Sequence, residues 1–315
     1  MPRQRLRRSV LACPGSNERM MAKAAASTAD EVFLDLEDAC APLEKPAARA
    51  RVVAALREHD WSGKVRAVRI NQVTSRYAYR DLLEVVQGAG DQLDCIMVPK
   101  VQDPGDVAFV DRGLTQLEQE LGLEPGAIGI EAQIEDPRGL ENASGIATAS
   151  PRVETLIFGP ADFSASMQLP ALTVAGGSCD YPGDIFHYVL FRLAVAARAA
   201  GIQVIDGPYL AIRDVEGYAL AARRAAALGY DGKWVLHPGQ LDACNAAFTP
   251  TQEQFERAVA ILEAYRQATD VERKGAVMLG DEMIDEASRK MAAVMVERGE
   301  AFGLRSRPWR PASAR

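Results

Sequence analysis

The stretch AIGIEAQIEDPRGLENASGIATASPRVETLIFGPADFSASM, residues 127–167, decides the fold of this chain. It contains two apolar runs typical of strands, residues 127–135 and 153–158, separated by a segment that predicts a short helix over residues 139–150. The first run ends in a turn that carries Glu135, and the second ends in a turn that carries Asp162. Strand, helix and strand in succession indicate neighbouring parallel strands with a right-handed crossover.

Two carboxylates at the ends of neighbouring strands suit a hard cation such as Mg²⁺, which takes oxygen ligands and keeps several waters. The alternative is that Glu135 and Asp162 only cap the helices that follow them, and for one such acid alone capping is the better explanation. Acids at the ends of two consecutive strands weaken this alternative. The pair therefore predicts a site for Mg²⁺, with Mn²⁺ as a substitute.

Apolar runs alternate with amphipathic helical patterns up to about residue 247. The runs expected to be strands are residues 9–12, 31–36, 64–70, 95–98, 127–134, 153–158, 203–205 and 233–236. This number of strands predicts a closed (β/α)₈ barrel, the TIM barrel, which usually takes about 250 residues. The alternative is an open doubly wound sheet. Such a sheet often has a glycine-rich phosphate loop after its first strand, and neither GxGxxG nor GxxxxGK[ST] occurs in this sequence.

Alternation along the strands indicates which polar side chains point into the barrel. In the fifth predicted strand Glu131, Gln133 and Glu135 share one face. Buried carboxylates need cations or hydrogen-bond donors, and Arg69 at the end of the third strand is the expected partner. A purely structural Arg–Glu pair inside the barrel is the alternative to a functional site.

Residues 248–304 are expected to form a C-terminal extension of two helices joined by a short strand and a turn. This extension is too small to bury its own core, so it must pack on the barrel or on a neighbouring subunit. Its turn carries Asp281, Glu282 and Asp285, which either belong to a lid over the site or form a solvated acidic helix start favoured by the helix dipole. The residues alone favour the solvated helix start. Residues 305–315 are predicted to be disordered.

Composition excludes several classes of protein. The 315 residues carry a net charge of −7, so no basic field exists to hold nucleic acid or an anionic membrane. No apolar run is long enough to span a membrane, and the basic start lacks the apolar segment of a signal peptide. The cysteines are scattered, without a CxxC pair, which is typical of reduced thiols in a cytoplasm. We therefore expect a cytoplasmic protein.

Several segments, in order and at matching spacing over nearly the whole chain, resemble the citrate lyase β-subunit-like (HpcH/HpaI-type) superfamily of acyl-CoA lyases. They are PGS (14–16), VFLDLEDACAP (32–42), VRIN (68–71), IMVPKV (96–101), the strand end at Glu135, GPADFSAS (159–166), DGPY (206–209), GKWVLHP (232–238) and GDEMIDEAS (280–288). The resemblance implies a (β/α)₈ TIM barrel with a C-terminal helical lid extension, in agreement with the strand count.

The resemblance also implies roles for individual residues. The acids that match Glu135 and Asp162 hold Mg²⁺ in this family. The arginine that matches Arg69 contacts the acyl-CoA near its thioester, and the backbone at Ala161 and Asp162 seats the 2-oxoacid. The acid that matches Asp285 lies in the lid, approaches from the adjacent subunit and acts as the base.

Further residues are expected to surround the metal and the thioester. The family's acids behind the metal waters match Glu37 and Asp38, and Lys100 is expected to pair with a barrel carboxylate rather than to touch substrate. The family's CoA contacts match Lys23, Leu236 and His237. For His237 the alternative is that it only caps the last barrel strand.

The expected reaction is a reversible Claisen-type cleavage of L-malyl-CoA to acetyl-CoA and glyoxylate, or of β-methylmalyl-CoA to propionyl-CoA and glyoxylate. The resemblance implies a homotrimer or homohexamer. A malyl-CoA thioesterase, a citramalyl-CoA lyase, the β subunit of a multi-protein citrate lyase and a barrel whose acids serve only stability stay open. Residues 168–188 are expected beside the site and to bear on the choice of acyl chain, whereas His187 is expected in the core.

Overall fold

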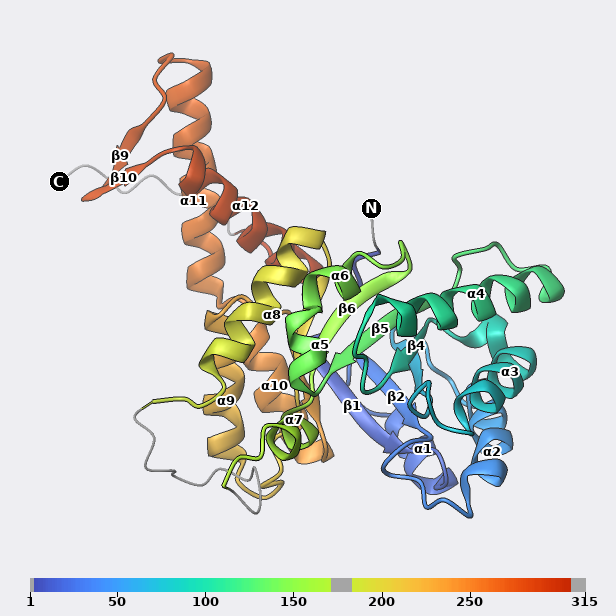
Figure 1. Cartoon of the computed structure of the whole chain (residues 1–315). Coiled ribbons are helices and arrows are strands. Elements are labelled where there is room, and N and C mark those ends of the chain that lie inside the picture. Colours follow the sequence, from blue (N-terminus) through green and yellow to red (C-terminus); the bar gives the residue numbers. More distant parts are fainter. Residues whose placement is uncertain (1–2, 171–182, 307–315) are drawn as a thin grey trace. The chain divides into compact units, whose positions relative to one another are not determined.

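Eight parallel strands pair in chain order and close into a barrel in the first unit of the chain, Met1–Phe248 (Figure 1). The strands are β1 (Ser9–Pro14), β2 (Glu31–Asp35), β3 (Val65–Arg69), β4 (Cys95–Val98), β5 (Gly129–Ile134), β6 (Val153–Phe158), β7 (Gln203–Asp206) and β8 (Gly232–Val235). The structure, a computed structural model, describes residues 3–170 and 183–306. The closed barrel confirms the predicted (β/α)₈ fold and overturns the doubly wound alternative.

Helices surround the strands of the barrel (Figure 1). They are α1 (Glu18–Ala25), α2 (Lys45–Glu58), α3 (Ala78–Ala89), α4 (Pro104–Leu121), α5 (Pro137–Glu141), α6 (Ala143–Ala147), α7 (Pro160–Ser166), α8 (His187–Ala200), α9 (Val215–Ala227) and α10 (Leu241–Phe248). The single helix predicted between β5 and β6 is in fact two short helices that meet at Asn142. The sequence analysis also missed α7, a short helix that begins at Pro160 and carries Asp162 in its first turn.

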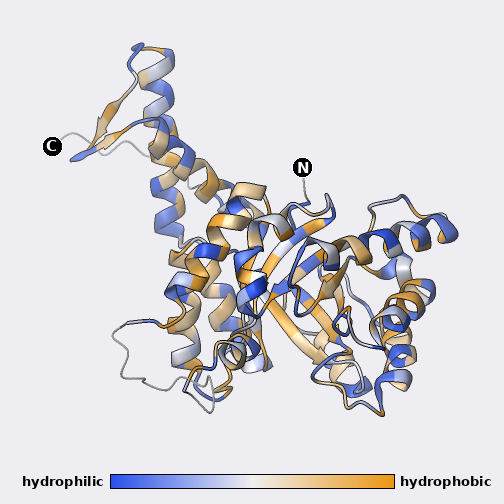
Figure 2. Cartoon of the chain, in the orientation of Figure 1, coloured by the Kyte–Doolittle hydropathy of each residue, from blue (hydrophilic) through white to orange (hydrophobic). Residues whose placement is uncertain are grey.

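The core has two apolar parts, one between the strands and the helices and a smaller one inside the barrel. Figure 2 shows apolar colour along most of β1 and β2, and a mixture of polar and apolar residues on the surrounding helices. The inner part consists of Val10, Phe33, Ala67, Cys95, Met97, Ile157, Ile205 and Trp234. Polar side chains lie at both ends of this inner core, so the barrel interior has a polar layer near the amino ends of the strands and another near their carboxyl ends.

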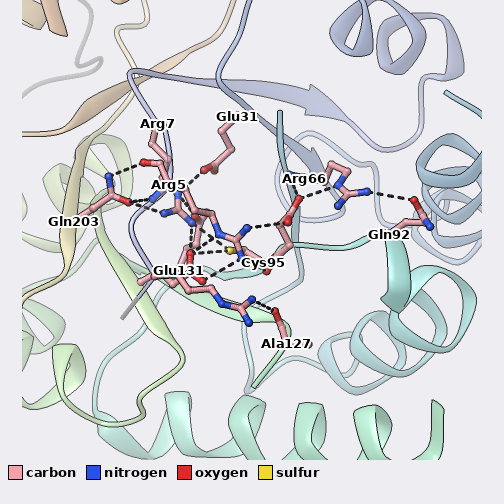
Figure 3. A network of polar contacts seen from close by, with 12 residues as sticks. Arg5, Arg7, Glu31, Arg66, Gln92, Cys95, Ala127, Glu131 and Gln203 are labelled. Carbon is pink, nitrogen blue, oxygen red and sulfur yellow. Dashed lines mark hydrogen bonds and ion pairs between the residues drawn. The ribbon is translucent and has the colours of Figure 1, made fainter. Parts of the chain in front are cut away.

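The polar layer at the amino ends of the strands centres on Arg7, which is fully buried (Figure 3). We call Arg5, Arg7, Glu31, Cys95, Glu131, Glu154 and Gln203 the basal cluster. Arg7 Nε lies 2.7 Å from Glu31 Oε2 and 3.0 Å from Glu131 Oε1. Arg7 Nη2 donates to Glu154 Oε2 at 2.6 Å. One guanidinium therefore contacts carboxyl groups from β2, β5 and β6.

The basal cluster corrects the expected partner of Glu131. The sequence analysis assigned the acids of β5 to Arg69, but Glu131 pairs with Arg7, and Arg69 pairs with a carboxylate of β2. The physical reason is distance along the strand. Glu131 and Glu135 are four residues apart, which is about 13 Å at a rise of about 3.3 Å per residue, so they belong to different layers of the barrel.

We expect the basal cluster to make stability depend on pH. Burial, together with the charge of Glu131, raises the pKa of Glu31 well above its ordinary value against the opposing effect of Arg7. The folded protein therefore keeps a proton that the unfolded chain releases above pH ~4.5, and this group's contribution to stability falls as pH rises. Glu31→Gln has no proton to retain at this position, so its free energy of unfolding should not fall with pH for this reason. Between pH 5 and pH 8 the free energy of unfolding of the variant should therefore rise relative to that of wild type, by at most about 1.4 kcal/mol per pH unit.

Urea denaturation of both proteins at pH 5, 6.5 and 8 measures this difference. Glu58→Gln, at the exposed end of α2, is the control and should follow wild type at every pH. A difference between Glu31→Gln and wild type that does not change with pH would contradict the assignment of a retained proton to Glu31.

The second unit, Thr249–Arg315, contains α11 (Gln252–Asp270), β9 (Val277–Leu279), β10 (Glu282–Ile284) and α12 (Glu286–Ala301). The predicted strand and turn are an antiparallel hairpin of β9 and β10, which turns at Gly280 in the left-handed region (φ +64°). Of the tail predicted to be disordered, residues 307–315 lie outside the described residues. Residues 171–182, in the middle of the predicted loop over 168–188, lie outside them as well. Within the described part of the chain, no helix is long and apolar enough to cross a membrane.

Candidate active site

The second polar layer lies at the carboxyl ends of β2 to β6, the face on which barrels of this type carry their active sites. We call its charged residues the acidic cluster: Asp35, Glu37, Asp38, Glu135 and Asp162, with Arg69 and Lys100. The cluster brings together the acids and cations that the sequence predicted at strand ends, and adds Asp35. Its seven side chains carry a formal charge of −3, which is typical of a site that binds a cation.

Arg69, the last residue of β3, is held from three sides. Its Nε and Nη2 donate to the two carboxylate oxygens of Asp35 at 2.8 and 2.7 Å. Its Nη1 lies 3.3 Å from Glu37 Oε2 and 3.4 Å from Gln133 Oε1. Burial alone would raise the pKa of Asp35, but the charge and hydrogen bonds of Arg69 lower it below its ordinary value. Asp35 is therefore ionised and fixes the plane of the guanidinium.

Aromatic rings of the inner core hold the guanidinium of Arg69 from another side. The Arg69 Cζ lies 5.6 Å from the ring centroid of Phe33 and 5.3 Å from that of Trp234, within the range of cation–π attraction. The sequence analysis missed Asp35. Strand alternation could have found it, because Glu31, Phe33 and Asp35 share one face of β2.

Glu135 follows β5 and is 3% exposed. Its Oε1 accepts the backbone N–H of Lys100 at 2.8 Å, and its Oε2 accepts from Gln133 Nε2 at 2.9 Å. Burial and the charge of Asp162, against the opposing charge of Arg69, raise the pKa of Glu135 to about 8. Gly159 is required beside it, since a Cβ there would lie 2.4 Å from Glu135 Oε2.

Asp162 lies in the first turn of α7, next to the exposed Ala161. Its side chain is 42% exposed, and its Oδ1 lies 3.8 Å from Lys100 Nζ. Asp162 and the buried Glu135 interact electrostatically. The site therefore offers one carboxylate held by hydrogen bonds and one that solvent reaches.

The donor chemistry of the acidic cluster fits Mg²⁺. Glu135 and Asp162 supply only oxygen ligands, and a divalent cation would offset the cost of an ionised carboxylate at the buried Glu135. Among residues 3–170 and 183–306, no group of three or more His, Cys, Asp or Glu side chains is arranged to hold a metal ion. Two carboxylates are the usual protein share for Mg²⁺, which keeps several waters and takes further oxygens from its substrate.

A buried lysine supports the loop that carries Glu37. Lys45 Nζ donates to the carbonyl oxygens of Leu36 and Glu37 at 2.8 and 2.6 Å, and to Asn71 Oδ1 at 2.6 Å. Asn71 in turn donates its backbone N–H and its Nδ2 to Asp81 Oδ2 at 2.9 and 2.6 Å. The sequence did not predict this role of Lys45. A lysine in the first turn of a helix is normally exposed to solvent, whereas Lys45 at the start of α2 is buried.

The predicted CoA contacts lie at one part of the barrel rim. Leu236 and His237 follow β8, and the exposed Lys23 lies in α1, which follows β1. Because β1 and β8 pair, these residues come from neighbouring positions around the barrel. His237 caps the short 3₁₀ helix Pro238–Gln240 that follows β8, since its Nδ1 accepts the N–H of Gly239 at 3.0 Å. Their contact with CoA stays a prediction.

Asp285 belongs to the second unit and caps α12. Its Oδ1 accepts from Ser288 N at 3.0 Å and from Ser288 Oγ at 3.1 Å, and these bonds lower the pKa of Asp285. This capping is the alternative considered from sequence, and the role as base stays a prediction. The expectation for His187 is wrong. It is exposed because it begins α8 on the same face as the exposed Phe191, with 6.2 Å between the ring centroids.

Comparisons with known proteins agree with this architecture. The family described as HpcH/HpaI aldolase/citrate lyase matches residues 8–238. The L-malyl-CoA/β-methylmalyl-CoA lyase of Cereibacter sphaeroides is 37% identical over 308 residues, which are 95% of this chain and 96% of that protein. The citrate lyase subunit beta of Haemophilus influenzae is 33% identical over 303 residues, which are 96% of this chain and 99% of that protein.

A solved structure is similar over the same span. It is CitE from Mycobacterium tuberculosis in complex with magnesium, acetoacetate and coenzyme A. The match has 30% identity and a TM-score of 0.73, and it covers 93% of this chain and 97% of that one. The matched family covers most of the chain, and two relatives exceed 30% identity over nearly their full length. With its closed barrel and acidic cluster, this chain belongs to the HpcH/HpaI aldolase/citrate lyase family.

Proposed function

We propose that this protein is a Mg²⁺-dependent carbon–carbon lyase of 3-hydroxyacyl-CoA thioesters. Its substrates are L-malyl-CoA, which yields acetyl-CoA and glyoxylate, and β-methylmalyl-CoA, which yields propionyl-CoA and glyoxylate. The observation that carries the proposal is the pairing of Glu135 and Asp162 beside an Arg69 fixed by Asp35. The relative of that name, 37% identical over 95% of this chain, supports the choice of substrates.

Glu135 and Asp162 would hold the metal, with Mn²⁺ as a substitute for Mg²⁺. When bound, the ion supplies a Lewis acid for the oxygens of glyoxylate. The backbone at Ala161 and Asp162 is the proposed seat of the glyoxylate carboxylate. Glu37 and Asp38 are the proposed acceptors of hydrogen bonds from waters around the ion. Glu37 is buried and pairs with Lys100 and Arg69, and Asp38 is more exposed.

Arg69 is the proposed electrostatic catalyst. Cleavage breaks the bond between the hydroxyl-bearing carbon and the carbon next to the thioester. The hydroxyl releases its proton to solvent as glyoxylate forms, and the electron pair of the broken bond develops as the thioester enolate. A guanidinium that is always charged and already oriented by Asp35 stabilises this negative charge without reorganising. The enolate then takes a proton and leaves as acetyl-CoA.

Asp285 is the proposed donor of that proton, and in the reverse direction the base that removes it. We propose that Asp285 acts on the site of an adjacent subunit in a homotrimer or homohexamer. Lys23, Leu236 and His237 are the proposed contacts of the CoA moiety. The chain's net charge of −7 and its lack of a basic field suit small-molecule substrates rather than nucleic acid or an anionic membrane. A cytoplasmic location is proposed from the scattered cysteines without a CxxC pair.

One observation favours a second candidate, the β subunit of a multi-protein citrate lyase. This chain is 33% identical to such a subunit from Haemophilus influenzae over 99% of its length. A subunit of that kind would need partner chains for turnover, whereas a complete lyase would act alone. A malyl-CoA thioesterase and a citramalyl-CoA lyase share the same expected residues and differ in their products or in their substrate.

The test is an assay of the purified full chain with L-malyl-CoA, first with Mg²⁺ and then with EDTA. We expect Mg²⁺-dependent release of equal amounts of glyoxylate and acetyl-CoA. Asp162→Asn should abolish the Mg²⁺ dependence together with most of the activity. Asp285→Asn should lower kcat by about 10²- to 10⁴-fold, the usual contribution of a general acid–base group.

Glu58→Gln, at the exposed end of α2, serves as the control and should keep full activity. Malate with free CoA as products would make the protein a thioesterase. Turnover of citramalyl-CoA in preference to malyl-CoA would change the substrate but not the chemistry. No turnover by the chain alone, restored by partner subunits, would favour the citrate lyase subunit.

A further inference from the structure

Lys100, which lies in the loop between β4 and α4 and in the acidic cluster, has an unusual backbone conformation. Its φ is +52°, and among the described residues only Gln168 and Arg273 share a positive φ without being glycine. A lysine rarely adopts this left-handed region, because its Cβ approaches the following carbonyl oxygen. Strained backbone at a site indicates that the residue is held there for a function that glycine would not supply.

Both ends of Lys100 contact carboxylates. Its backbone N–H donates to Glu135 Oε1 at 2.8 Å. Its side-chain ammonium forms an ion pair with Glu37 and lies 3.5 Å from Asp38 Oδ2 and 3.8 Å from Asp162 Oδ1. A glycine could make the first contact but none of the others. The left-handed backbone therefore lets one residue bind the acids that follow β2, β5 and β6.

The two cations of the cluster are not equivalent. Two nitrogens of Arg69 donate hydrogen bonds to Asp35. Its guanidinium is buried and lies against the rings of Phe33 and Trp234. Lys100 is the cation whose charge reaches Asp162, the exposed member of the pair assigned to the metal. Two positive charges that share one carboxylate repel each other, and at separations near 4 Å this repulsion is large even in a partly solvated site.

We propose that Lys100 is a built-in counter-ion of the acidic cluster that competes with the divalent cation for Asp162 and so sets the affinity of the site for metal. The inference rests on the proposed metal site at Glu135 and Asp162. It assigns Lys100 two effects of opposite direction. The ammonium stabilises the acids when no metal is bound, and it weakens metal binding, so that the ion is held loosely enough to exchange.

The experiment compares wild type with Lys100→Gln, which removes the charge and keeps the backbone N–H to Glu135. Protein treated with EDTA and dialysed is titrated with Mg²⁺ by calorimetry, and with Mn²⁺ by electron paramagnetic resonance. Thermal unfolding is measured with and without Mg²⁺. We expect Lys100→Gln to bind both ions on the order of ten-fold more tightly. We also expect a lower Tm than wild type without metal and a larger rise in Tm on adding Mg²⁺.

Two matched variants separate charge from side-chain shape and from general effects. Lys100→Arg keeps the positive charge, so its Kd for Mg²⁺ should stay close to that of wild type. Lys64→Gln removes a charge at the opposite end of the barrel, where Lys64 Nζ donates to the carbonyl of Ser27, and should not change the Kd either.

Weaker or unchanged Mg²⁺ binding by Lys100→Gln, with wild type binding the ion normally, would overturn the inference alone. It would mean that the lysine orients the ligands or does not influence them. Absence of Mg²⁺ and Mn²⁺ binding by both wild type and Lys100→Gln would overturn the metal site of the proposed function and this inference with it.

Discussion

Arg69→Lys is expected to lower the kcat of malyl-CoA cleavage by about 10²- to 10³-fold, the usual effect of removing one group aimed at a developing oxyanion. Lysine keeps the positive charge, but its ammonium cannot donate two parallel bonds to the oxygens of Asp35 as the guanidinium does at 2.8 and 2.7 Å. The charge would then no longer be held in the orientation that the thioester enolate needs. Steady-state kinetics with saturating Mg²⁺ measures kcat and KM separately.

The matched control for this prediction is Arg66→Lys in the same strand. Arg66 points away from the site and pairs with Asp94 at 2.8 Å near the amino end of the barrel. The Arg66→Lys variant should keep the kcat of wild type and its affinity for Mg²⁺. An Arg69→Lys enzyme with unchanged kcat would contradict the assigned role. A rise in KM with unchanged kcat would mean that Arg69 contributes to substrate binding rather than to stabilisation of the transition state.

Arg7→Met is expected to lower the free energy of unfolding by about 3–5 kcal/mol, the usual cost of removing one partner from a buried ion-pair network. Arg7 is 1% exposed and contacts Glu31, Glu131 and Glu154 within 3.0 Å. Without its guanidinium, Glu31 and Glu131 lose the cation that lies between them inside the barrel. Urea denaturation followed by circular dichroism at pH 7 measures the loss.

A second variant keeps this prediction testable if Arg7→Met does not fold. Arg7→Met combined with Glu131→Gln removes one of the carboxylates left without a cation, and should recover part of the lost stability. The exposed ion pair of Arg57 with Asp91 supplies the comparison, since its removal by Arg57→Met should cost at most about 1 kcal/mol. Equal losses for Arg7→Met and Arg57→Met would contradict the structural role of the basal cluster.

The sequence by itself determined the strands of the barrel and the face on which its candidate site lies. Strand β6 was predicted with its observed bounds, and β4 likewise. These elements are decided by local properties, because apolar runs, their two-residue alternation and the turns that end them lie within ten residues of one another. The same alternation brought Arg69 and Glu135 to the barrel interior, and their positions at strand ends brought them to one face.

Only the tertiary structure decided which charges meet. Arg7 donates to Glu154, 147 residues away, and Lys45 donates to Asn71, 26 residues away. Which distant side chains meet depends on the stagger of the closed barrel and on the layer in which each side chain lies. Neither can be predicted from a local sequence pattern. For the same reason the sequence assigned Glu131 to Arg69, since alternation gives the face of a strand but not the height along the barrel.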